Sequence, residues 1–428
     1  MTALRPDMTT NALRPRMHLT PPAGWMNDPH GVFHIDGRYH LFFQHVPDSL
    51  VHATGCHWGH ATSPDLLHWE VEPIALSPDG EDGEDVGVWS GCAVIDDQGE
   101  PRLFYTSVGP PDVHRGSIRT ARPSDAGLAT WAKGPVIAEP PGWDVAVFRD
   151  PVVFRDGPVW RMLVGQGDTR GVAGVATYRS GDLETWHHDG LLVSRSFGEE
   201  PFTGTAWECP QLVRRTDGLD ADVLVFSVWS GDPHHVSASA GTYTEGRFIP
   251  GAWQQVTLAG SHYAPTHFTD VDGRPCLLFW VRGVGEPGVW AGAISVPYVV
   301  SVEAGAVRLT PHPAVAAARR DPVGSEPGTA LDIEWSPRSG SRLSLLGPDG
   351  LARAELTMSD GVLRVRTAAG GTDVVVDHHG PSLRIVADAQ VLEVVADGGL
   401  VGLPLTDVDG GLVPATDDPG ELSWWHLT

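Results

Sequence analysis

Residues 63–69 read SPDLLHW and residues 180–186 read SGDLETW, so the two stretches share the pattern Ser-x-Asp-Leu-x-x-Trp. A degraded copy, SDAGLATW, stands between them at 124–131. The spacing of the repeat is about 60 residues, which is long enough for four strands and their loops. The tryptophans that mark the series stand at positions 69, 131, 186 and 253. This recurrence favours a fold built from several similar β-sheets, as in a β-propeller.

The surrounding sequence consists of short β-rich runs separated by clusters of Gly, Pro, Asp and Asn. Examples are RYHLFFQHV at 38–46, PRLFYTSV at 101–108, VLVFSVW at 223–229 and PCLLFWV at 275–281. Long amphipathic helical patterns do not occur. With about 60 residues in each repeat, residues 21–310 predict an all-β, five-bladed β-propeller catalytic domain. An ordinary β-sandwich with recurrent turns and tryptophans is the alternative that the repeat leaves open.

The composition changes after residue 310. Residues 311–328, PHPAVAAARRDPVGSEPG, have an Ala-rich centre followed by a Pro/Gly break, which predicts a linker with a short helix. Residues 329–428 alternate in the manner of strands and predict a β-sandwich domain. At the other end, residues 1–20 are polar and interrupted by proline, so we expect a flexible tail.

The charge and the cysteines exclude several kinds of partner. The 428 residues carry a formal net charge of −25, which disfavours binding to nucleic acid or to a membrane. The four cysteines lie far apart without zinc-ligand spacing, so we expect neither a disulfide framework nor a metal site. The amino-terminus lacks the apolar run of a signal peptide, which predicts a cytoplasmic protein.

Three acidic residues lie in segments that would hold a carboxylate in a defined state. In GWMNDPHG, residues 24–31, Asn27 can donate a hydrogen bond to Asp28. Pro29 restricts Asp28 to an extended or turn conformation. These neighbours predict an ionised, oriented carboxylate, although the segment taken alone is also an ordinary turn.

The second acid is Asp150, in VFRDPVVF at 147–154. Arg149 and Asp150 interrupt two apolar runs, and the arginine is expected to keep the carboxyl group ionised. A structural salt bridge at a strand end would have the same sequence, so this motif alone does not separate a catalytic site from a structural one.

The third acid is Glu208, in TAWECPQLV at 205–213. It stands between Trp207 and the Cys209-Pro210 pair, and such an apolar setting should raise the pKa of its carboxyl group. A raised pKa is what a general acid needs. A glutamate at a strand edge in contact with water is the structural alternative.

Glycoside cleavage uses carboxyl groups in two opposite states, because one attacks the sugar while the other protonates the leaving oxygen. A propeller would bring acids from three different blades together at its central axis. The wide separation of the three acids along the chain is therefore compatible with a single glycosidase site.

The order of the three motifs resembles that in glycoside hydrolase family 32. WMNDPHG, FRDP and WECP follow one another as in that family of invertases, inulinases and levanases. The similarity covers roughly residues 14–300 and includes LFFQH, WGHATSPDLLHW, VWSGCAV, HYAPTHF and GAISVPY. The combination is far more specific than any single motif.

This resemblance implies a five-bladed propeller followed by a β-sandwich, and an exo-acting hydrolase that releases fructose from β-fructofuranosides with retention of configuration. It implies Asp28 as nucleophile, Glu208 as acid/base and Asp150 as a ligand of fructosyl hydroxyl groups. Retention requires the first two carboxyl groups to lie about 5 to 5.5 Å apart. No metal or organic cofactor is implied. The positions that match the fructosyl pocket are Asn27, Gln44, Trp58, Ser90 and Arg149, with Cys209 beside the acid/base.

Some positions depart from the family pattern. In VWSGC, Trp89 and Cys92 stand where phenylalanine and a small residue are usual, and Trp89 joins the expected substrate-binding residues. His30 replaces the commoner asparagine of the first motif, and Ser261 and Gln211 stand where aspartate is usual. None of these changes affects the three acids, but they leave the preferred fructoside, linkage and chain length open.

Three other functions stay open. A fructosyltransferase would intercept the same covalent intermediate with a sugar in place of water. A non-catalytic fructan-binding protein would keep the fold without the activity. A hydrolase of another furanoside would share the arrangement of acids. In each case the expected partner is a small-molecule or oligosaccharide ligand, and the sequence predicts no oligomeric state.

Overall fold

The computed structural model describes residues 13–80, 83, 85–322, 326–368, 373–418 and 422–428. Within these residues the only helical elements are the short α-helix α1 (Pro313–Ala317) and the single 3-10 turn η1 (Arg215–Asp217). Strands form the rest of the regular structure, so the predicted all-β class is confirmed. Neither helix among the described residues has the length and apolar character needed to cross a membrane.

Three four-stranded antiparallel sheets follow one another along the chain, and each is a meander whose strands pair in sequence order. The first contains β5 (Gly87–Ile95), β6 (Pro101–Val108), β7 (Ser117–Pro123) and β8 (Trp131–Ala138). The second contains β9 (Val145–Asp156), β10 (Val159–Asp168), β11 (Val172–Ser180) and β12 (His187–Ser196). The third contains β13 (Ala206–Val213), β14 (Asp222–Trp229), β15 (Pro233–Thr244) and β16 (Arg247–Gln255).

A nine-stranded sheet joins the beginning of this region to its end. It contains β1 (Gly24–Ile35), β2 (Arg38–Val46), β3 (His57–Ser63), β4 (Glu70–Leu76), β18 (His262–Thr269), β19 (Pro275–Glu286), β20 (Trp290–Ile294), β21 (Tyr298–Glu303) and β22 (Ala306–Pro311). The strand order is β22-β21-β19-β20-β1-β2-β3-β4, and β18 also pairs with β19. Gly24 opposite Trp290 and Trp25 opposite Ala291 form a short parallel pairing between β1 and β20, which connects the first group of strands to the last.

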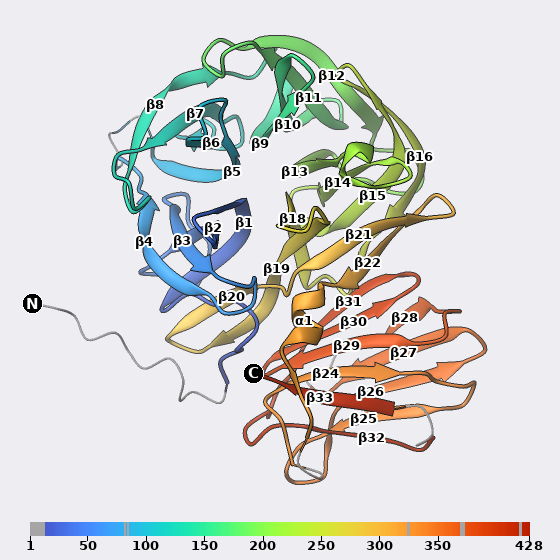
Figure 1. Cartoon of the computed structure of the whole chain (residues 1–428). Helices are drawn as coiled ribbons and strands as arrows, with labels where there is room; N and C mark the ends of the chain where they lie inside the picture. Colours follow the sequence, from blue (N-terminus) through green and yellow to red (C-terminus); the bar gives the residue numbers. More distant parts are fainter. Residues whose placement is uncertain (1–12, 81–82, 84, 323–325, 369–372, 419–421) are drawn as a thin grey trace, which may run out of the picture.

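The sheets stand around one axis, as Figure 1 shows. The strands nearest the axis are β1, β5, β9, β13 and β18, which pack against one another in that order, and β18 returns to β1. Buried side chains fill the space between neighbouring sheets, for example Phe42 against the sheet of Tyr105 and Leu163 against the sheet of Phe226. Burial of this apolar surface stabilises the arrangement. Five inner strands therefore surround a common axis.

The repeated Ser-x-Asp-Leu-x-x-Trp segments form the same turn in different sheets. Between β3 and β4, Ser63 Oγ accepts a hydrogen bond from Leu66 N at 2.9 Å, and Trp69 Nε1 donates to Leu66 O at 3.0 Å. Corresponding bonds form within residues 180–186, between β11 and β12. The central leucine has a positive φ in both turns, 72° at Leu66 and 65° at Leu183. The sequence repeat is thus a structural repeat at the connection to the fourth strand.

Two sheets make up the carboxy-terminal part, and buried side chains from both, such as Ile333 and Leu356, share one apolar core. The seven-stranded sheet has the order β17-β31-β30-β29-β24-β33-β23, and the five-stranded sheet has the order β28-β27-β26-β25-β32. Their strands are β17 (Thr257–Leu258), β23 (Arg319–Arg320), β24 (Ala330–Trp335), β25 (Arg342–Leu346), β26 (Ala352–Ser359), β27 (Val362–Thr367), β28 (Val374–Asp377), β29 (Leu383–Asp388), β30 (Val391–Ala396), β31 (Gly399–Pro404), β32 (Val413–Thr416) and β33 (Leu422–Leu427).

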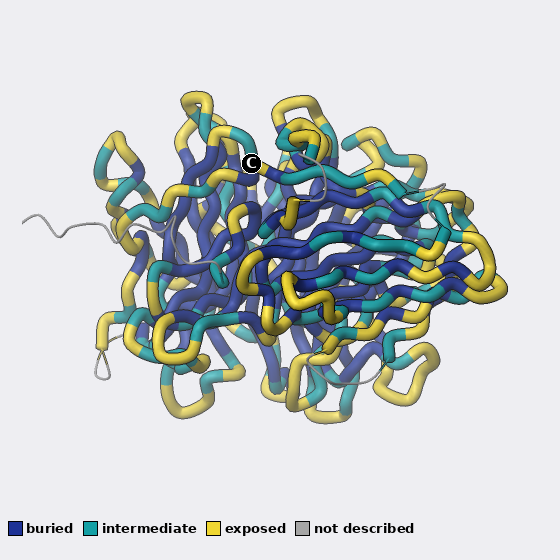
Figure 2. Tube along the Cα trace, turned by 90° about the horizontal axis from the view of Figure 1, so that it is seen from below, coloured by how far each residue is buried: buried dark blue, intermediate teal, exposed yellow. Residues whose placement is uncertain are grey.

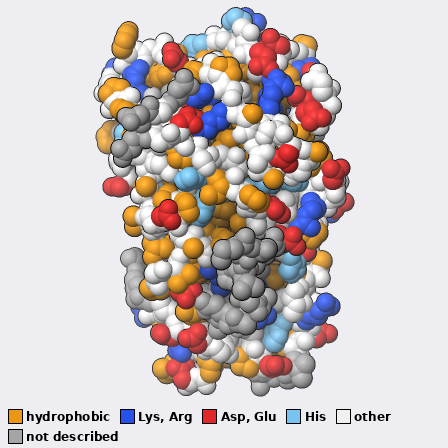
Figure 3. All heavy atoms as spheres, turned by 90° about the vertical axis from the view of Figure 1, so that its left-hand side faces the viewer, with side chains coloured by type: hydrophobic (Ala, Val, Ile, Leu, Met, Phe, Trp, Pro, Cys, Tyr) orange, Lys and Arg blue, Asp and Glu red, His pale blue; other side chains and the backbone are white. Residues whose placement is uncertain are grey.

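Burial follows the strands in both parts of the chain. Figure 2 shows buried residues along the strands and exposed residues gathered in the loops at the two ends of the sheets. On the face drawn in Figure 3, acidic and basic side chains are interspersed, and neither sign forms a continuous patch. The negative net charge is therefore distributed over this face rather than concentrated at one place.

Residues 13–20 are not part of a flexible tail, so the prediction for residues 1–20 was wrong in this portion. Met17, His18 and Leu19 are buried. The backbone N–H groups of Arg16 and Met17 donate to the carboxylate of Asp388 at 2.9 and 2.7 Å. The prediction considered the prolines and polar residues but not the apolar side chains that reach the core. Residues 1–12 lie outside the described residues.

A buried group of charged side chains links this amino-terminal segment to both parts of the chain. His18 Nδ1 lies 2.8 Å from Asp388 Oδ2, and His18 Nε2 lies 3.3 Å from Glu393 Oε2. Glu393 Oε1 lies 2.7 Å from Nε2 of His262, the first residue of β18. Burial opposes the charge on His18, but Glu393 and Asp388 outweigh it and raise the pKa of His18 to about 10. In spite of burial, His18 and His262 lower the pKa of Glu393 to about 2.

Candidate active site

The pairing register slips in all five inner strands at the positions of candidate site residues. Such a β-bulge redirects side chains and bends the strand. The residues at, or directly before, these bulges are Asp28, Ser90, Asp150, Glu208 and Tyr263. Three bulges contain a non-glycine residue with positive φ: Asp150 at 62°, Cys209 at 46° and Ala264 at 49°. The bulges direct these side chains toward the shared axis.

These side chains border a pocket of about 300 Å³. It brings together all three predicted acids and four of the predicted binding residues, together with aromatic side chains from several sheets. The lining residues are Trp25, Asn27, Asp28, Gln44, His52, Trp89, His114, Arg149, Asp150, Glu208, Trp229, Gly231, Pro233, Tyr263 and Trp280. The small volume and the aromatic walls suit a single sugar unit.

Asp28 is held by hydrogen bonds to both of its carboxyl oxygens. Asn27 Nδ2 donates to Oδ1 at 3.0 Å, as the sequence predicted, and Ser90 Oγ donates to Oδ2 at 2.8 Å. Gln44 joins the two donors, because its Oε1 accepts from Asn27 at 3.1 Å and its Nε2 donates to Ser90 at 2.5 Å. Burial and the charge of Glu208 raise the pKa of Asp28 above its usual value, although these hydrogen bonds oppose the shift. The network fixes the orientation of the carboxyl group.

Glu208 does not have the apolar surroundings that its sequence neighbours predicted. Arg149 Nη2 lies 2.6 Å from Glu208 Oε1, and the hydroxyl group of Tyr263 donates to Glu208 Oε2 at 2.5 Å. The prediction considered Trp207 and the Cys209-Pro210 pair, but strand neighbours do not determine what faces a side chain across the axis. The structure therefore gives Glu208 one cationic partner and one hydroxyl donor.

Asp150 also differs from its prediction. The sequence suggested that Arg149 keeps it ionised, but the guanidinium group pairs with Glu208. Burial and the charge of Glu208 raise the pKa of Asp150 to about 7, although Arg149 opposes this shift. The backbone N–H of Cys209 donates to Asp150 Oδ2 at 2.9 Å. Near neutral pH this carboxyl group can therefore either donate or accept a hydrogen bond.

Two predicted binding residues lie behind the pocket wall. Trp58 is completely buried and its Nε1 donates to the carbonyl oxygen of Trp89 at 3.0 Å, so it supports the strand that carries Trp89 and does not line the pocket. Cys209 Sγ lies 3.6 Å from Oδ2 of both Asp28 and Asp150. The thiol packs under the two carboxyl groups. Ser90, the remaining predicted residue outside the lining, acts through its bond to Asp28.

The sequence predicted Trp89 as a binding residue but missed Trp229, His114 and His52, which also surround Arg149. Its guanidinium carbon lies 5.5 Å from the ring centre of Trp89 and 5.3 Å from that of Trp229. Its Nη1 lies 3.0 Å from His114 Nδ1. Burial and then the charge of Arg149 lower the pKa values of His114 and His52. The histidines of this wall are therefore neutral over most of the physiological pH range, and Arg149 is fixed between aromatic rings.

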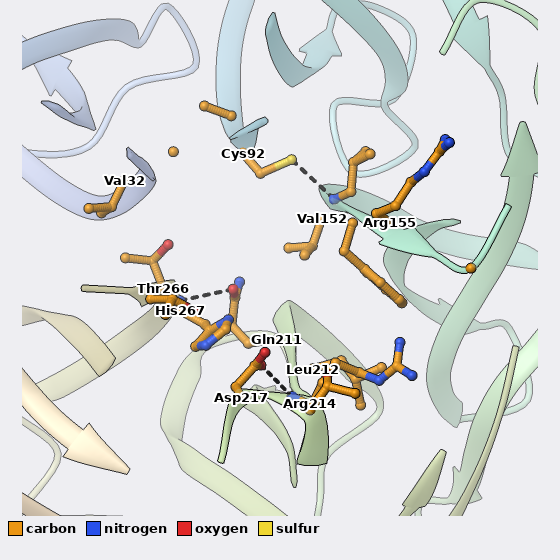
Figure 4. Close-up of a pocket in the computed structure, with 17 residues that line it drawn as sticks. Val32, Cys92, Val152, Arg155, Gln211, Leu212, Arg214, Asp217, Thr266 and His267 are labelled. Carbon is orange, nitrogen blue, oxygen red and sulfur yellow. Dashed lines mark hydrogen bonds between the residues drawn. The ribbon is translucent and has the colours of Figure 1, made fainter. Parts of the chain in front are cut away.

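A second cavity of about 370 Å³ lies further along the same inner strands (Figure 4). Its walls include Val32, Cys92, Val152, Gln211 and His267. Gln211 Oε1 accepts from His267 N at 3.0 Å, and Cys92 Sγ accepts from Val153 N at 3.2 Å. Asp217 is the only acidic residue among its lining residues. This cavity lacks the set of facing carboxyl groups that distinguishes the first pocket.

One buried group among the described residues has the residue types of a metal site, namely Asp270, Cys276 and His312. Its carboxylate is already engaged, because Asp270 Oδ2 accepts hydrogen bonds from His312 Nε2 and Arg274 Nη1, both at 2.8 Å. The neighbouring guanidinium group disfavours a second cation. We therefore assign this group to fold stabilisation and not to the candidate site.

Comparisons with known proteins identify the family to which the chain belongs. The family model described as Glycosyl hydrolases family 32 N-terminal domain matches residues 18–313. A sucrose-6-phosphate hydrolase of Escherichia coli is 34% identical over 328 residues, which cover 70% of this chain and 65% of that protein. A raffinose invertase of Escherichia coli is 33% identical over 331 residues, covering 72% and 67%. The chain thus spans about two thirds of the length of these relatives.

The fold is also similar to that of a solved family member. The structure of a Bombyx mori GH32 beta-fructofuranosidase superposes with a TM-score of 0.84 at 24% identity, covering 97% of this chain and 94% of that one. The matched family model extends over more than half of this chain and includes every residue of the pocket. The protein therefore belongs to glycoside hydrolase family 32.

Proposed function

We propose that the protein is a retaining, exo-acting hydrolase that releases fructose from β-fructofuranosides such as sucrose, fructo-oligosaccharides or fructans. The observation that carries this proposal is the meeting of Asp28, Asp150 and Glu208 in one small aromatic pocket. The names of its relatives, a sucrose-6-phosphate hydrolase and a raffinose invertase, support the same substrate class. The pocket volume of about 300 Å³ supports attack on a terminal unit rather than on the interior of a chain.

In the first step, a carboxylate oxygen of Asp28 attacks the anomeric carbon of the terminal fructosyl unit. The bond from this carbon to the glycosidic oxygen breaks, and Glu208 gives its proton to the departing oxygen. Asn27 and Ser90 hold the attacking carboxylate in position. The product of this step is a fructosyl ester on Asp28 and a free aglycone.

In the second step, water replaces the aglycone. Glu208 takes a proton from the water, whose oxygen attacks the anomeric carbon and releases Asp28. Arg149 and Tyr263 contact Glu208 and stabilise its charged form in both steps. Asp150 binds fructosyl hydroxyl groups, a role supported by its position beside both reacting groups and by its capacity to donate or accept. Two displacements restore the starting configuration.

The domain organisation is part of the proposal. Five inner strands with four-stranded meanders support a five-bladed β-propeller over residues 21–310, and two sheets around one core support a β-sandwich over 329–428. The proposed linker of residues 311–328 includes α1, and its residues 323–325 lie outside the described residues. All pocket residues come from the propeller, so we propose that the sandwich stabilises the fold without touching the substrate at the fructosyl position.

Time-resolved sugar analysis tests the reaction. Incubation with sucrose, short fructo-oligosaccharides, inulin or levan should release free fructose from the first time points, without oligosaccharide intermediates from internal cuts. Proton NMR of the first product should show the β-anomer before mutarotation. An initial α-anomer would contradict the double displacement. Glucose in excess of fructose would indicate transfer to sugars, and binding without any product would favour a non-catalytic protein.

The acid role of Glu208 predicts a dependence on the leaving group. Glu208→Gln removes the transferable proton, and the loss of kcat/KM on sucrose should be about 10²-fold to 10⁴-fold. Fructosides with an activated aryl leaving group need less protonation and should lose much less in formation of the covalent intermediate. Pre-steady-state release of the aryl group measures this step. Glu303→Gln, the same change at an exposed glutamate of β21 outside the pocket, serves as control; equal losses on both substrate types would contradict the assignment of Glu208.

A further inference from the structure

A single tryptophan on the rim of the ring is almost fully exposed. Trp143 lies in the connection from β8 to β9, and 96% of its surface is accessible. Figure 1 places β8 at the outside of the ring and β9 inside it, so this connection runs inward from the rim. An exposed indole presents a large apolar face with a polar edge, which is the kind of surface on which sugar rings stack.

The backbone of this connection is fixed by one arginine. Arg115 Nη1 donates to the carbonyl oxygen of Trp143 at 3.2 Å and also to that of Val145, and Arg115 Nη2 donates to Gly142 O at 3.3 Å. Charge-assisted hydrogen bonds of this type are stronger than neutral ones. The tryptophan is therefore presented on a defined backbone, which lowers the entropic cost of binding a ligand there.

Beside Trp143 lies a hollow of about 610 Å³, roughly twice the volume of the catalytic pocket. Its lining includes three prolines, two serine hydroxyl groups, one carboxylate and the guanidinium group of Arg115. Among the lining residues are Ser107, Pro110, Ser117, Glu139, Pro140 and Trp143. Rigid apolar surface interrupted by hydrogen-bonding groups suits a neutral, hydroxyl-rich ligand longer than one sugar unit.

Adjacent residues line the hollow and the catalytic pocket. His114 lines the pocket and Arg115, the next residue, lines the hollow. Two backbone hydrogen bonds attach this segment to β9: Phe148 N donates to His114 O at 2.9 Å, and Gly116 N donates to Phe148 O at 3.1 Å. Arg149 follows Phe148 and contacts Glu208. The hollow therefore lies next to the side of the pocket that His114 lines.

We propose that this hollow is a distal sugar-binding subsite, in which Trp143 stacks against a sugar ring of a long fructoside whose terminal fructosyl unit occupies the catalytic pocket. This inference rests on the proposed function. It assigns oligosaccharides and fructans to the enzyme as substrates, rather than sucrose alone. Val145 and Asp150 are separated by about 16 Å along β9, from a rise of about 3.3 Å per residue. Sucrose is too short to bridge such a distance, whereas a chain of several sugar units reaches Trp143.

Kinetics as a function of chain length test the subsite. Trp143→Ala should lower kcat/KM on inulin-type chains by about tenfold, through KM, and leave sucrose hydrolysis unchanged. Trp143→Phe keeps a stacking face and should retain most of the activity on long chains. Ile249→Ala, which also removes an exposed apolar side chain from the propeller, should have no effect on any substrate. Equal activity of wild type and Trp143→Ala on long chains would overturn the subsite.

A binding experiment separates failure of the subsite from failure of the proposed function. Isothermal titration of inulin oligosaccharides into Asp28→Ala, with and without Trp143→Ala, measures the subsite without turnover. A tenfold weaker affinity in the double variant supports the subsite even if the wild type released no fructose. An unchanged affinity overturns it even if the wild type were fully active. Circular dichroism of each variant checks that the fold is intact.

Discussion

The Asp28→Ala variant is expected to lose almost all release of fructose, with kcat lower on the order of 10⁴-fold to 10⁶-fold on every substrate. In the proposed mechanism the covalent intermediate forms on this carboxylate, and no other carboxyl group in the pocket has the same pair of donors, Asn27 and Ser90. Initial rates with sucrose and inulin measure the loss. Substrate binding should persist, because Asp28→Ala leaves the aromatic wall in place.

Asp48→Ala is the matched control, since it removes an exposed carboxylate from the loop that follows β2 and should keep wild-type rates. Rapid quenching followed by mass spectrometry adds a direct readout. The wild type should carry one fructosyl group on the peptide that contains Asp28, and Asp28→Ala should carry none. A fructosylated Asp150, or an Asp28→Ala variant within tenfold of the wild-type rate, would contradict the assignment of the nucleophile.

The largest effect on stability is expected from Glu393→Gln. Glu393 is buried between His18 and His262, and removing one partner from such a group typically costs about 3 to 5 kcal/mol of the free energy of unfolding. Urea denaturation at pH 6 measures the loss. Glu355→Gln, a half-exposed glutamate of β26, is the control and should change stability by less than about 1 kcal/mol. Equal losses of unfolding free energy in Glu393→Gln and Glu355→Gln would contradict a larger contribution of the buried group to stability.

The same group predicts the pH dependence of stability. Folding raises the pKa of His18 from 6.5 to about 10, so its contribution is fully present below pH 6.5 and disappears as the pH rises toward 10. Folding lowers the pKa of Glu393 from 4.5 to about 2, so its contribution is fully present above pH 4.5 and disappears as the pH falls toward 2. The difference in stability between wild type and Glu393→Gln should therefore be largest between pH 4.5 and 6.5.

Much of the fold could be predicted from local sequence. The Ser-x-Asp-Leu-x-x-Trp repeat indicated recurring sheets because its serine and tryptophan bond within the turn itself, so the motif and its structure depend on the same few residues. The amino-terminal segment was not predictable in this way. Its partners, Asp388 and Glu393, lie almost the whole length of the chain away, and nothing in the local sequence of His18 points to them.

In the candidate site, too, contacts between adjacent residues were predictable and contacts between distant strands were not. The bond from Asn27 to Asp28 was predictable because the residues are adjacent. The pairing of Arg149 with Glu208 rather than Asp150, and the contact of Tyr263 with Glu208, depend on bulges in different strands. Asp150 and Ala264 adopt positive φ without being glycine. A proline follows each of them, but this local feature does not indicate which side chains the bulges bring together. Only the HYAPTHF segment, as part of the family resemblance, marked Tyr263 at all.

The pairing of β1 with β20 affects how the protein is made. β1 leaves the ribosome first among the inner strands, but it cannot meet β20 until residue 294 has been synthesised. At about 5 to 20 residues per second, the delay is on the order of ten seconds or more. During this time Gly24 and Trp25 of β1 lack their partners in β20, and an unpaired strand edge is a template for another chain. Nascent chains are therefore more open to aggregation than finished ones, and chaperones that bind during translation should raise the soluble yield more than those that act afterwards.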